Sequence, residues 1–297
     1  MNKRIKLLQQ VLIILVAGSL ATLFVMPILI TITNSFMTGF EISNRYAIAV
    51  SPANHFYTLE VFPQIHFVRM TLVPMWVTLR QYFTLFQDVG YINSLWNAVL
   101  ITAPSVLGQM VICVPAAYAF EFSRWRHKEK VFFVYVVVML MPLPVVLVPQ
   151  FIVAGWLGIS ESVLAIILPA IFAPFGVFLL RQFMKSFPTE VVEAAKIDGA
   201  GQILILLNIV VPLLKPAIAA LALLVFVDYW NVVDQAIVFI TDPARQPLSV
   251  YLSNPRIRDN FNIIFAASVF YMLPALLVFL HGQEYLVEGM KMSGLRG

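Results

Sequence analysis

Apolar residues along this chain gather into six long runs, which polar segments separate. Each run is close to or longer than the roughly 20 residues that a helix needs to cross the hydrocarbon core of a bilayer. The runs cover residues 8–32, 95–120, 131–154, 163–180, 217–240 and 263–280. The pattern predicts an all-α polytopic membrane protein with six transmembrane helices, in which residues 1–297 form a single transmembrane domain.

The composition supports this prediction. Only 11% of the residues are charged, whereas soluble domains average about 25%. The single cysteine, Cys113, excludes an internal disulfide and a CxxC metal or redox site. The first apolar run continues through Ile32, beyond the roughly 7–15 residues of a signal-peptide core, so we expect an uncleaved first span.

Basic residues predict the orientation of the chain in the membrane. If the N-terminus is cytoplasmic, the cytoplasmic segments hold more than twice as many Lys and Arg residues as the outer ones, and the short RWRHKEK segment at 124–130 contributes most clearly. The positive-inside rule therefore places both termini in the cytoplasm. Residues 34–92 then form an extracytoplasmic loop, residues 181–216 a cytoplasmic loop and residues 283–297 a cytoplasmic tail.

The cytoplasmic loop contains the stretch EAAKIDGAGQILILLNIVVP, at residues 193–212. Acidic Glu190 suits the start of a short helix, and Gly199 can adopt the left-handed conformation that closes it. We expect a second short helix over residues 202–211. Because so short a helix is not stable alone in water, the first one must dock on another surface.

The spacing of this stretch resembles a known family. Glu193-Ala194-Ala195, then Gly199, Ile209 and Pro212, match the EAA loop in membrane subunits of ATP-binding-cassette (ABC) importers, with Val211 where that pattern has Leu. The segments NSLWNAVLITAPSVLGQMVICVPAAYAFEFSR, LAIILPAIFAPFGVFLLRQFMKSFP and QEYLVEGMKMSGLRG resemble the carbohydrate-uptake branch, in particular the maltose-type subunit with a short cytoplasmic tail. Residues 37–80 resemble that family least.

The resemblance implies a type I importer permease in a bacterial or archaeal cytoplasmic membrane. It implies a second homologous membrane subunit, two ABC ATPase subunits, an extracytoplasmic solute-binding protein, a carbohydrate substrate and surrounding membrane lipid, with no nucleic acid. The coupling residues that it implies are Glu193, Ala194, Ala195 and Gly199, with Glu190 and Asp198 as rim contacts. ATP and magnesium are then bound by the partner subunits.

The motifs that this sequence lacks agree with that division of labour. No G-x-x-x-x-G-K-[ST] stretch is present to bind nucleotide phosphates, and the four histidines are scattered without an HExxH pair. We therefore expect no catalytic residue, no metal site and no cofactor in this chain.

Polar residues in the fifth run mark a candidate substrate pathway. On one continuous helix, Asp228, Asn231, Asp234 and Gln235 fall within a stripe about 120° wide, which Trp230 borders and Tyr229 does not. Carboxylates inside a bilayer usually face a bundle interior or a water-filled cavity, and carboxylates, amides and aromatic faces suit a sugar. Alternatively, these residues pair with neighbouring helices.

The resemblance leaves this pathway open. The pair Trp230-Asn231 matches the family, but Val232 stands where relatives often have an acid, and in the maltose-type system the sugar contacts chiefly the other membrane subunit. The outer loop at 241–262 is expected to face the binding protein. Its Arg245, Arg256 and Arg258 either favour an acidic solute or form a solvated face.

One competing hypothesis is a self-sufficient carrier driven by an ion gradient, with Asp228 and Asp234 as proton or cation sites. Carriers of that class usually show internal repeats and broken helices at the membrane midplane. No clear internal repeat is visible in this sequence.

Overall fold

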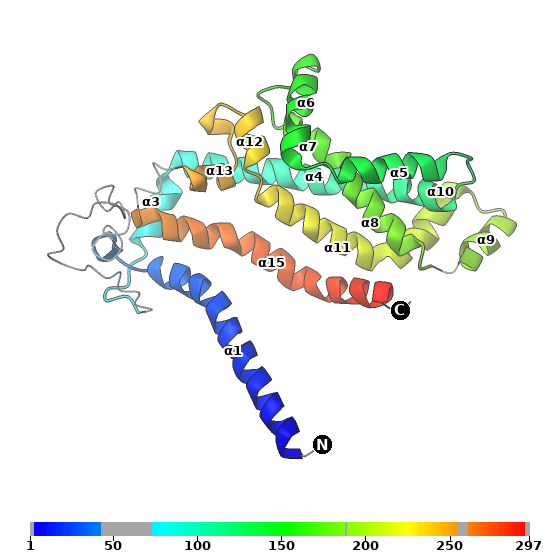
Figure 1. The fold of residues 1–297 in the computed structure, drawn as a ribbon. Helices are drawn as coiled ribbons and strands as arrows, with labels where there is room; N and C mark the ends of the chain where they lie inside the picture. Colours follow the sequence, from blue (N-terminus) through cyan, green and yellow to red (C-terminus); the bar gives the residue numbers. More distant parts are fainter. Residues whose placement is uncertain (1–2, 43–72, 188, 255–260, 295–297) are drawn as a thin grey trace. The chain divides into compact units, whose positions relative to one another are not determined.

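A computed structural model describes residues 3–42, 73–187, 189–254 and 261–294, and the side chains of 10–42, 73–187, 190–254 and 263–285. All regular elements in these ranges are helical (Figure 1). Among them, the helices long and apolar enough to cross a membrane are Gln10–Asn34, Val89–Phe122, Leu164–Met184, Gln202–Trp230 and Ile263–Tyr285. A bent pair, Lys128–Met139 with Leu143–Trp156, brings the number to six if it is one span. The prediction of an all-α polytopic membrane protein is confirmed.

The third apolar run is not the single helix that the sequence predicted. Helix α5 (Lys128–Met139) ends, and α6 (Leu143–Trp156) starts again at an angle of 104°. Pro142 lacks an N–H group and disfavours a helical conformation at Met141, so α5 cannot continue through it. Pro144 lies in the first turn of α6, where its missing N–H costs nothing.

The fifth run also differs from its predicted bounds. A continuous helical stretch starts at Gln202 with α10 (Gln202–Ile205), passes through a π-helix (Leu206–Val210) and continues as α11 (Val211–Trp230). The expected second short helix is therefore the beginning of this span. Pro212 explains the widened turn, because its ring would clash with a carbonyl of the preceding α-helical turn.

The same stretch ends earlier than predicted. Residues 231–233 are not helical, and the chain resumes as α12 (Asp234–Phe239). Spans also occupy both ends of the predicted loop 181–216, because α8 (Pro174–Met184) includes Arg181 and the next span starts at Gln202. The second span starts at Val89, inside the predicted outer loop 34–92, of which residues 43–72 lie outside the described residues.

The chain divides into two compact units, and the first comprises Met1–Val89 with Leu252–Met272. It contains α1 (Lys3–Asn34), α3 (Arg80–Gln87) and the first part of α15 (Phe261–Gly294). The Tyr82 hydroxyl lies 2.6 Å from the Ser35 hydroxyl, and the Tyr82 ring packs edge-on against Phe270 at 5.8 Å. These contacts connect α3 with the end of α1 and the start of α15.

The second unit comprises Gly90–Tyr251 with Leu273–Gly297. Helix α4 (Val89–Phe122), α5, α8 and α11 lie alongside one another in it (Figure 1). We call one end of this unit the inner end: α4 and α8 terminate there, and α5 and α10 begin there. We call the other end the outer end. It contains residues 157–163, the end of α11, α12, the 3₁₀ turn Pro243–Arg245 and α13 (Leu248–Ser253).

Each end of the second unit has its own buried cluster. The inner cluster is built on α4, α8, α10 and α11 and includes Val192 of α9 (Thr189–Ile197). The outer cluster joins α4, α6, α12 and α13 to α7 (Leu164–Ile171), with Ile166 and Phe239 fully buried. Gly176 lets α8 approach α4 closely, because a Cβ there would lie 2.7 Å from Cys113 Sγ.

Candidate functional site

The predicted EAA helix is present as α9. It covers Thr189–Ile197 and ends where Gly199 adopts a φ of +79°, a left-handed conformation that glycine adopts without steric cost. The amide of Gly199 donates to the Lys196 carbonyl at 3.2 Å, and the amide of Ala200 donates to the Ala195 carbonyl at 3.0 Å. The prediction of a short helix that closes on Gly199 is confirmed.

Helix α9 has an inner and an outer face. Val192, only 2% exposed, belongs to the inner cluster, and Ala195 packs against it. The outer face carries exposed Val191, Ala194 and Ile197, with Glu190 and Asp198 also exposed. Ile197 is 85% exposed, more than any other large apolar side chain of the described residues. The outer face of α9 is therefore an exposed apolar surface outside the candidate spans.

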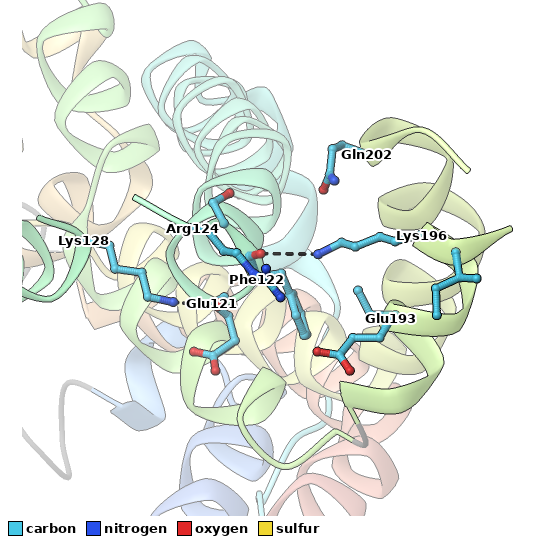
Figure 2. A pocket seen from close by; sticks show the side chains of 10 residues that line it. Glu121, Phe122, Arg124, Lys128, Glu193, Lys196 and Gln202 are labelled. Atoms are coloured by element: carbon cyan, nitrogen blue, oxygen red, sulfur yellow. Dashed lines mark hydrogen bonds between the residues drawn. The ribbon is translucent and has the colours of Figure 1, made fainter. Parts of the chain in front are cut away.

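A cavity of about 850 Å³ lies behind α9, between it and the ends of α4 and α5 (Figure 2). Glu193, Lys196 and the exposed Ile197 line it from α9, and Arg124 lines it from the turn after α4. Ile197, the last residue of α9, therefore borders both the outer face and the mouth of the cavity. Lys196 Nζ points across to the Phe122 carbonyl at 3.4 Å, and Lys128 Nζ donates to the Glu121 carbonyl at 2.9 Å. Both ammonium groups therefore neutralise the negative C-terminal end of α4.

A further contact joins α4 to the start of the fifth span. The Tyr118 hydroxyl donates to Gln202 Oε1 at 2.7 Å, and Gln202 is another residue that lines the cavity. The segment from α9 to α10 is thus attached to α4 at both of its helices.

A buried arginine joins the same helix ends. Arg181, in the last turn of α8 and 2% exposed, donates through Nε to Glu121 Oε2 at 3.1 Å and through Nη2 to Glu129 Oε1 at 2.5 Å. Its guanidinium carbon lies 4.0 Å from the centre of the Phe132 ring. We call Arg181, Glu121, Glu129 and Phe132 the Arg181 cluster.

The structure does not place the predicted substrate-pathway residues on one helical stripe. Asp228 is exposed on α11 and Asn231 follows the end of that helix, whereas Asp234 and Gln235 belong to α12. The stripe is wrong because residues 231–233 interrupt the helix on which it was drawn.

The aromatic residues of this segment point into the protein. Trp230 is 2% exposed and stacks on Phe226, with ring centres 5.5 Å apart. Tyr229 packs against both buried clusters. A role for the six residues at the pathway (Asp228, Tyr229, Trp230, Asn231, Asp234 and Gln235) stays a prediction.

At the outer end, Glu161 clamps two connecting segments together. Its backbone has a φ of +60°, a rare conformation for a residue other than glycine. Its carboxylate accepts hydrogen bonds from the Thr241 amide at 2.8 Å and the Thr241 hydroxyl at 2.9 Å, and its carbonyl accepts one from Arg245 at 3.2 Å. We call this set of contacts the Glu161 clamp.

Residues 109–292, more than half of the chain, match the family described as "Binding-protein-dependent transport system inner membrane component". The chain belongs to this family. It is the multi-pass permease subunit of a binding-protein-dependent ABC importer in the inner membrane, and a binding protein and a separate ATPase subunit belong to the same system. The competing hypothesis of a self-sufficient carrier driven by an ion gradient is therefore wrong.

Two curated relatives illustrate the similarity. The chain is 27% identical over 261 residues to the arabinooligosaccharides transport system permease protein AraQ of Halalkalibacterium halodurans, which covers 84% of this chain and 92% of that protein. It is 32% identical over 210 residues to the melibiose/raffinose/stachyose import permease protein MelC of Bacillus subtilis, covering 69% of this chain and 76% of that protein.

A solved structure agrees on the fold. It is the crystal structure of a bacterial ABC transporter involved in the import of the acidic polysaccharide alginate, with a TM-score of 0.77 over 96% of this chain and 99% of that chain. Its sequence identity of 22% limits the likeness to the fold.

Sequence reasoning missed three features of this site. The first is the near-complete exposure of Ile197. The others are the buried Arg181 cluster and the Glu161 clamp. An arginine inside the apolar stretch FLLRQFM was the one available signal for the Arg181 cluster.

Proposed function

We propose that this permease imports a sugar or oligosaccharide and that an ATPase subunit docks on the outer face of α9. The observation that carries the docking proposal is the exposed stripe of Val191, Ala194 and Ile197. Three apolar side chains next to one another on a charged loop stabilise an interface once they are buried. Glu190 and Asp198 flank the stripe, so its partner fits best as an apolar groove with a basic rim.

The alanines and the glycine have distinct roles in this proposal. Ala194 on the outer face and Ala195 on the inner face permit close approach on both sides of α9, because a methyl group adds little bulk. Gly199 ends the helix, and Asp198 stays exposed beside it. Glu193 lines the cavity behind α9, so in this proposal the ATPase contacts it only at the edge of the interface.

The complete transporter then contains a second homologous membrane subunit and two ATPase subunits. The exposed Asp228 and Asn231 at the end of α11 suit the interface with that second subunit. In this arrangement the six pathway residues line or gate the route of the solute.

A carbohydrate solute is supported by the relatives. The names of three similar permeases refer to arabinooligosaccharides, to melibiose, raffinose and stachyose, and to lactose. An acidic solute gains no support from Arg245, whose side chain is engaged with Asp242 at 3.6 Å and with the Glu161 carbonyl. Arg256 and Arg258 lie outside the described residues.

The docking proposal is tested by Ile197→Asp in the assembled complex. Placing a carboxylate in an apolar groove should lower the amount of co-purified ATPase at least about tenfold, as expected for a central interface residue. His127→Asp adds the same charge at an exposed position just before α5 and should leave attachment unchanged. Full ATPase attachment with Ile197→Asp would contradict docking on this face.

The solute class is tested separately on the cognate binding protein. Titration calorimetry with neutral and acidic oligosaccharides should show binding of at least one neutral sugar. Binding of amino acids or inorganic ions, with no response to any saccharide, would exclude the carbohydrate assignment and leave the docking proposal untouched.

A further inference from the structure

Burying Arg181 costs folding free energy. A guanidinium loses its hydration on burial, and apolar residues of similar volume are often as stabilising or more so. Arg181 Nη1 has no hydrogen-bond partner among the described residues, so the cluster is not optimised for stability alone. Its Nε and Nη2 bonds instead fix three helix ends in one geometry: α4 through Glu121, α5 through Glu129, and α8 itself.

The position of the cluster relates it to coupling. Helix α8 leads in chain order to α9, so any displacement of α9 acts first on the last turn of α8, where Arg181 lies. Helix α9 also reaches α4 directly, because Lys196 donates to the carbonyl of Phe122, the neighbour of Glu121. The last two residues of α4 are thus held from α8 and from α9 at once.

The two carboxylates differ in their surroundings. Glu121 is 19% exposed and Glu129 is 66% exposed. Glu129 can therefore be changed with less disturbance of the packing than Glu121.

We propose that Arg181 is a positioning residue for energy coupling, which makes α4, α5 and α8 move with α9 as one body when the ATPase subunits close. This inference rests on the proposed docking of an ATPase on α9. Without the arginine, α8 and α9 would still be pulled by the ATPase, but the force would reach α4 and α5 only through weaker contacts. ATP hydrolysis would then continue with less transport.

The experiment compares Arg181→Met and Arg181→Lys in the complete transporter, reconstituted in liposomes with its binding protein. The measured quantity is solute taken up per ATP hydrolysed. Arg181→Met should co-purify with ATPase and lower this ratio about tenfold, within the usual range of coupling between sites. Arg181→Lys should give an intermediate ratio, because an ammonium group lacks the guanidinium fork that bonds both carboxylates.

A wild-type ratio in Arg181→Met would overturn the proposal. If Arg181→Met fails to insert or assemble, Glu129→Gln decides, since it leaves the buried Arg181–Glu121 pair intact. A lower ratio with normal assembly supports the proposal, and an unchanged ratio reduces the cluster to a structural role. Lys130→Gln, an exposed change in the same turn of α5, is the matched control.

Failure of the docking proposal would be recognised in another assay. Ile197→Asp reports on the attachment of the ATPase, whereas the Arg181 variants report on the transport ratio of a complex that remains attached. The two results are therefore independent readouts.

Discussion

The two ends of the second unit are held together in opposite ways. At the inner end, a buried arginine and two lysines bind carboxylates and terminal carbonyls of neighbouring helices. At the outer end, the exposed Glu161 clamp binds one connecting segment to another through the backbone. The Arg181–Glu121 pair lies largely inside the protein and breaks only together with the packing around it, whereas the exposed contacts of Glu161 exchange with water. We therefore expect the inner end to move as a unit and the outer end to open locally.

The largest expected loss of stability comes from adding a methyl group at Gly176, where α8 lies close to α4. In Gly176→Ala the new methyl group would meet Cys113 Sγ, Gln109 Nε2 and Leu221 Cδ2 at 2.7, 3.1 and 3.2 Å. Overpacking of this kind costs about 1–3 kcal/mol, so the melting temperature in detergent should fall clearly. Gly18→Ala, with nothing within 4 Å of the added carbon, is the control. Equal melting temperatures for the two variants would mean that the inner cluster is loosely packed.

The second effect concerns the end of α9. In Gly199→Ala an L-residue must adopt a φ of +79°, which costs about 1–2 kcal/mol and should increase hydrogen exchange across α9. Gly201→Ala is matched to it, since Gly201 has a φ of −68° and equally open surroundings. Faster exchange in both variants would show that chain stiffness, and not the left-handed turn, sets the length of α9.

Helix α9 and the Arg181 cluster show which features the sequence can predict and which it cannot. The EAA helix and its closure depend on residues within one turn of each other, so local chemistry was sufficient for α9 and Gly199. The Arg181 cluster depends on partners 60 and 52 positions away, which no local pattern reveals. The break at residues 231–233 contains neither Pro nor Gly, and therefore the pathway stripe was drawn across it. The bend at Pro142, in contrast, had a visible signal in the sequence MPLP that the length of the apolar run outweighed.

A smaller effect is expected at the outer end. Glu161→Ala removes both bonds to Thr241, at about 1 kcal/mol, but keeps the unfavourable backbone conformation. Hydrogen exchange should rise at Thr241 and the turn that follows, with no change in α9 or in ATPase attachment. Ser160→Ala, in the same exposed turn, serves as the control. A change that spread to α9 would contradict the separation of the two ends.

The smallest effect is expected for Arg245→Gln. The variant loses an ion pair with Asp242 that spans 3.6 Å between two exposed side chains, and such pairs contribute about 0–1 kcal/mol. It also loses an exposed bond to the Glu161 carbonyl, for which the Gln amide can substitute only if it reaches that far. Thermal unfolding should shift little, and less still at high salt, because ions screen exposed charges. A shift as large as that of Glu161→Ala would make Arg245 the main component of the clamp.

The π-helix at Leu206–Val210 sets the angle between the buried faces of α10 and α11. One extra residue in a helical turn rotates everything beyond it by about 100° relative to an unbroken α-helix. The faces of α10 and α11 are therefore out of phase, and Gln202 meets Tyr118 while α11 keeps its own buried side toward α8. An unbroken α-helix over the same residues would keep every apolar position by type and turn the buried side of α11 away from α8. The register of this span is thus set by the π-helical turn.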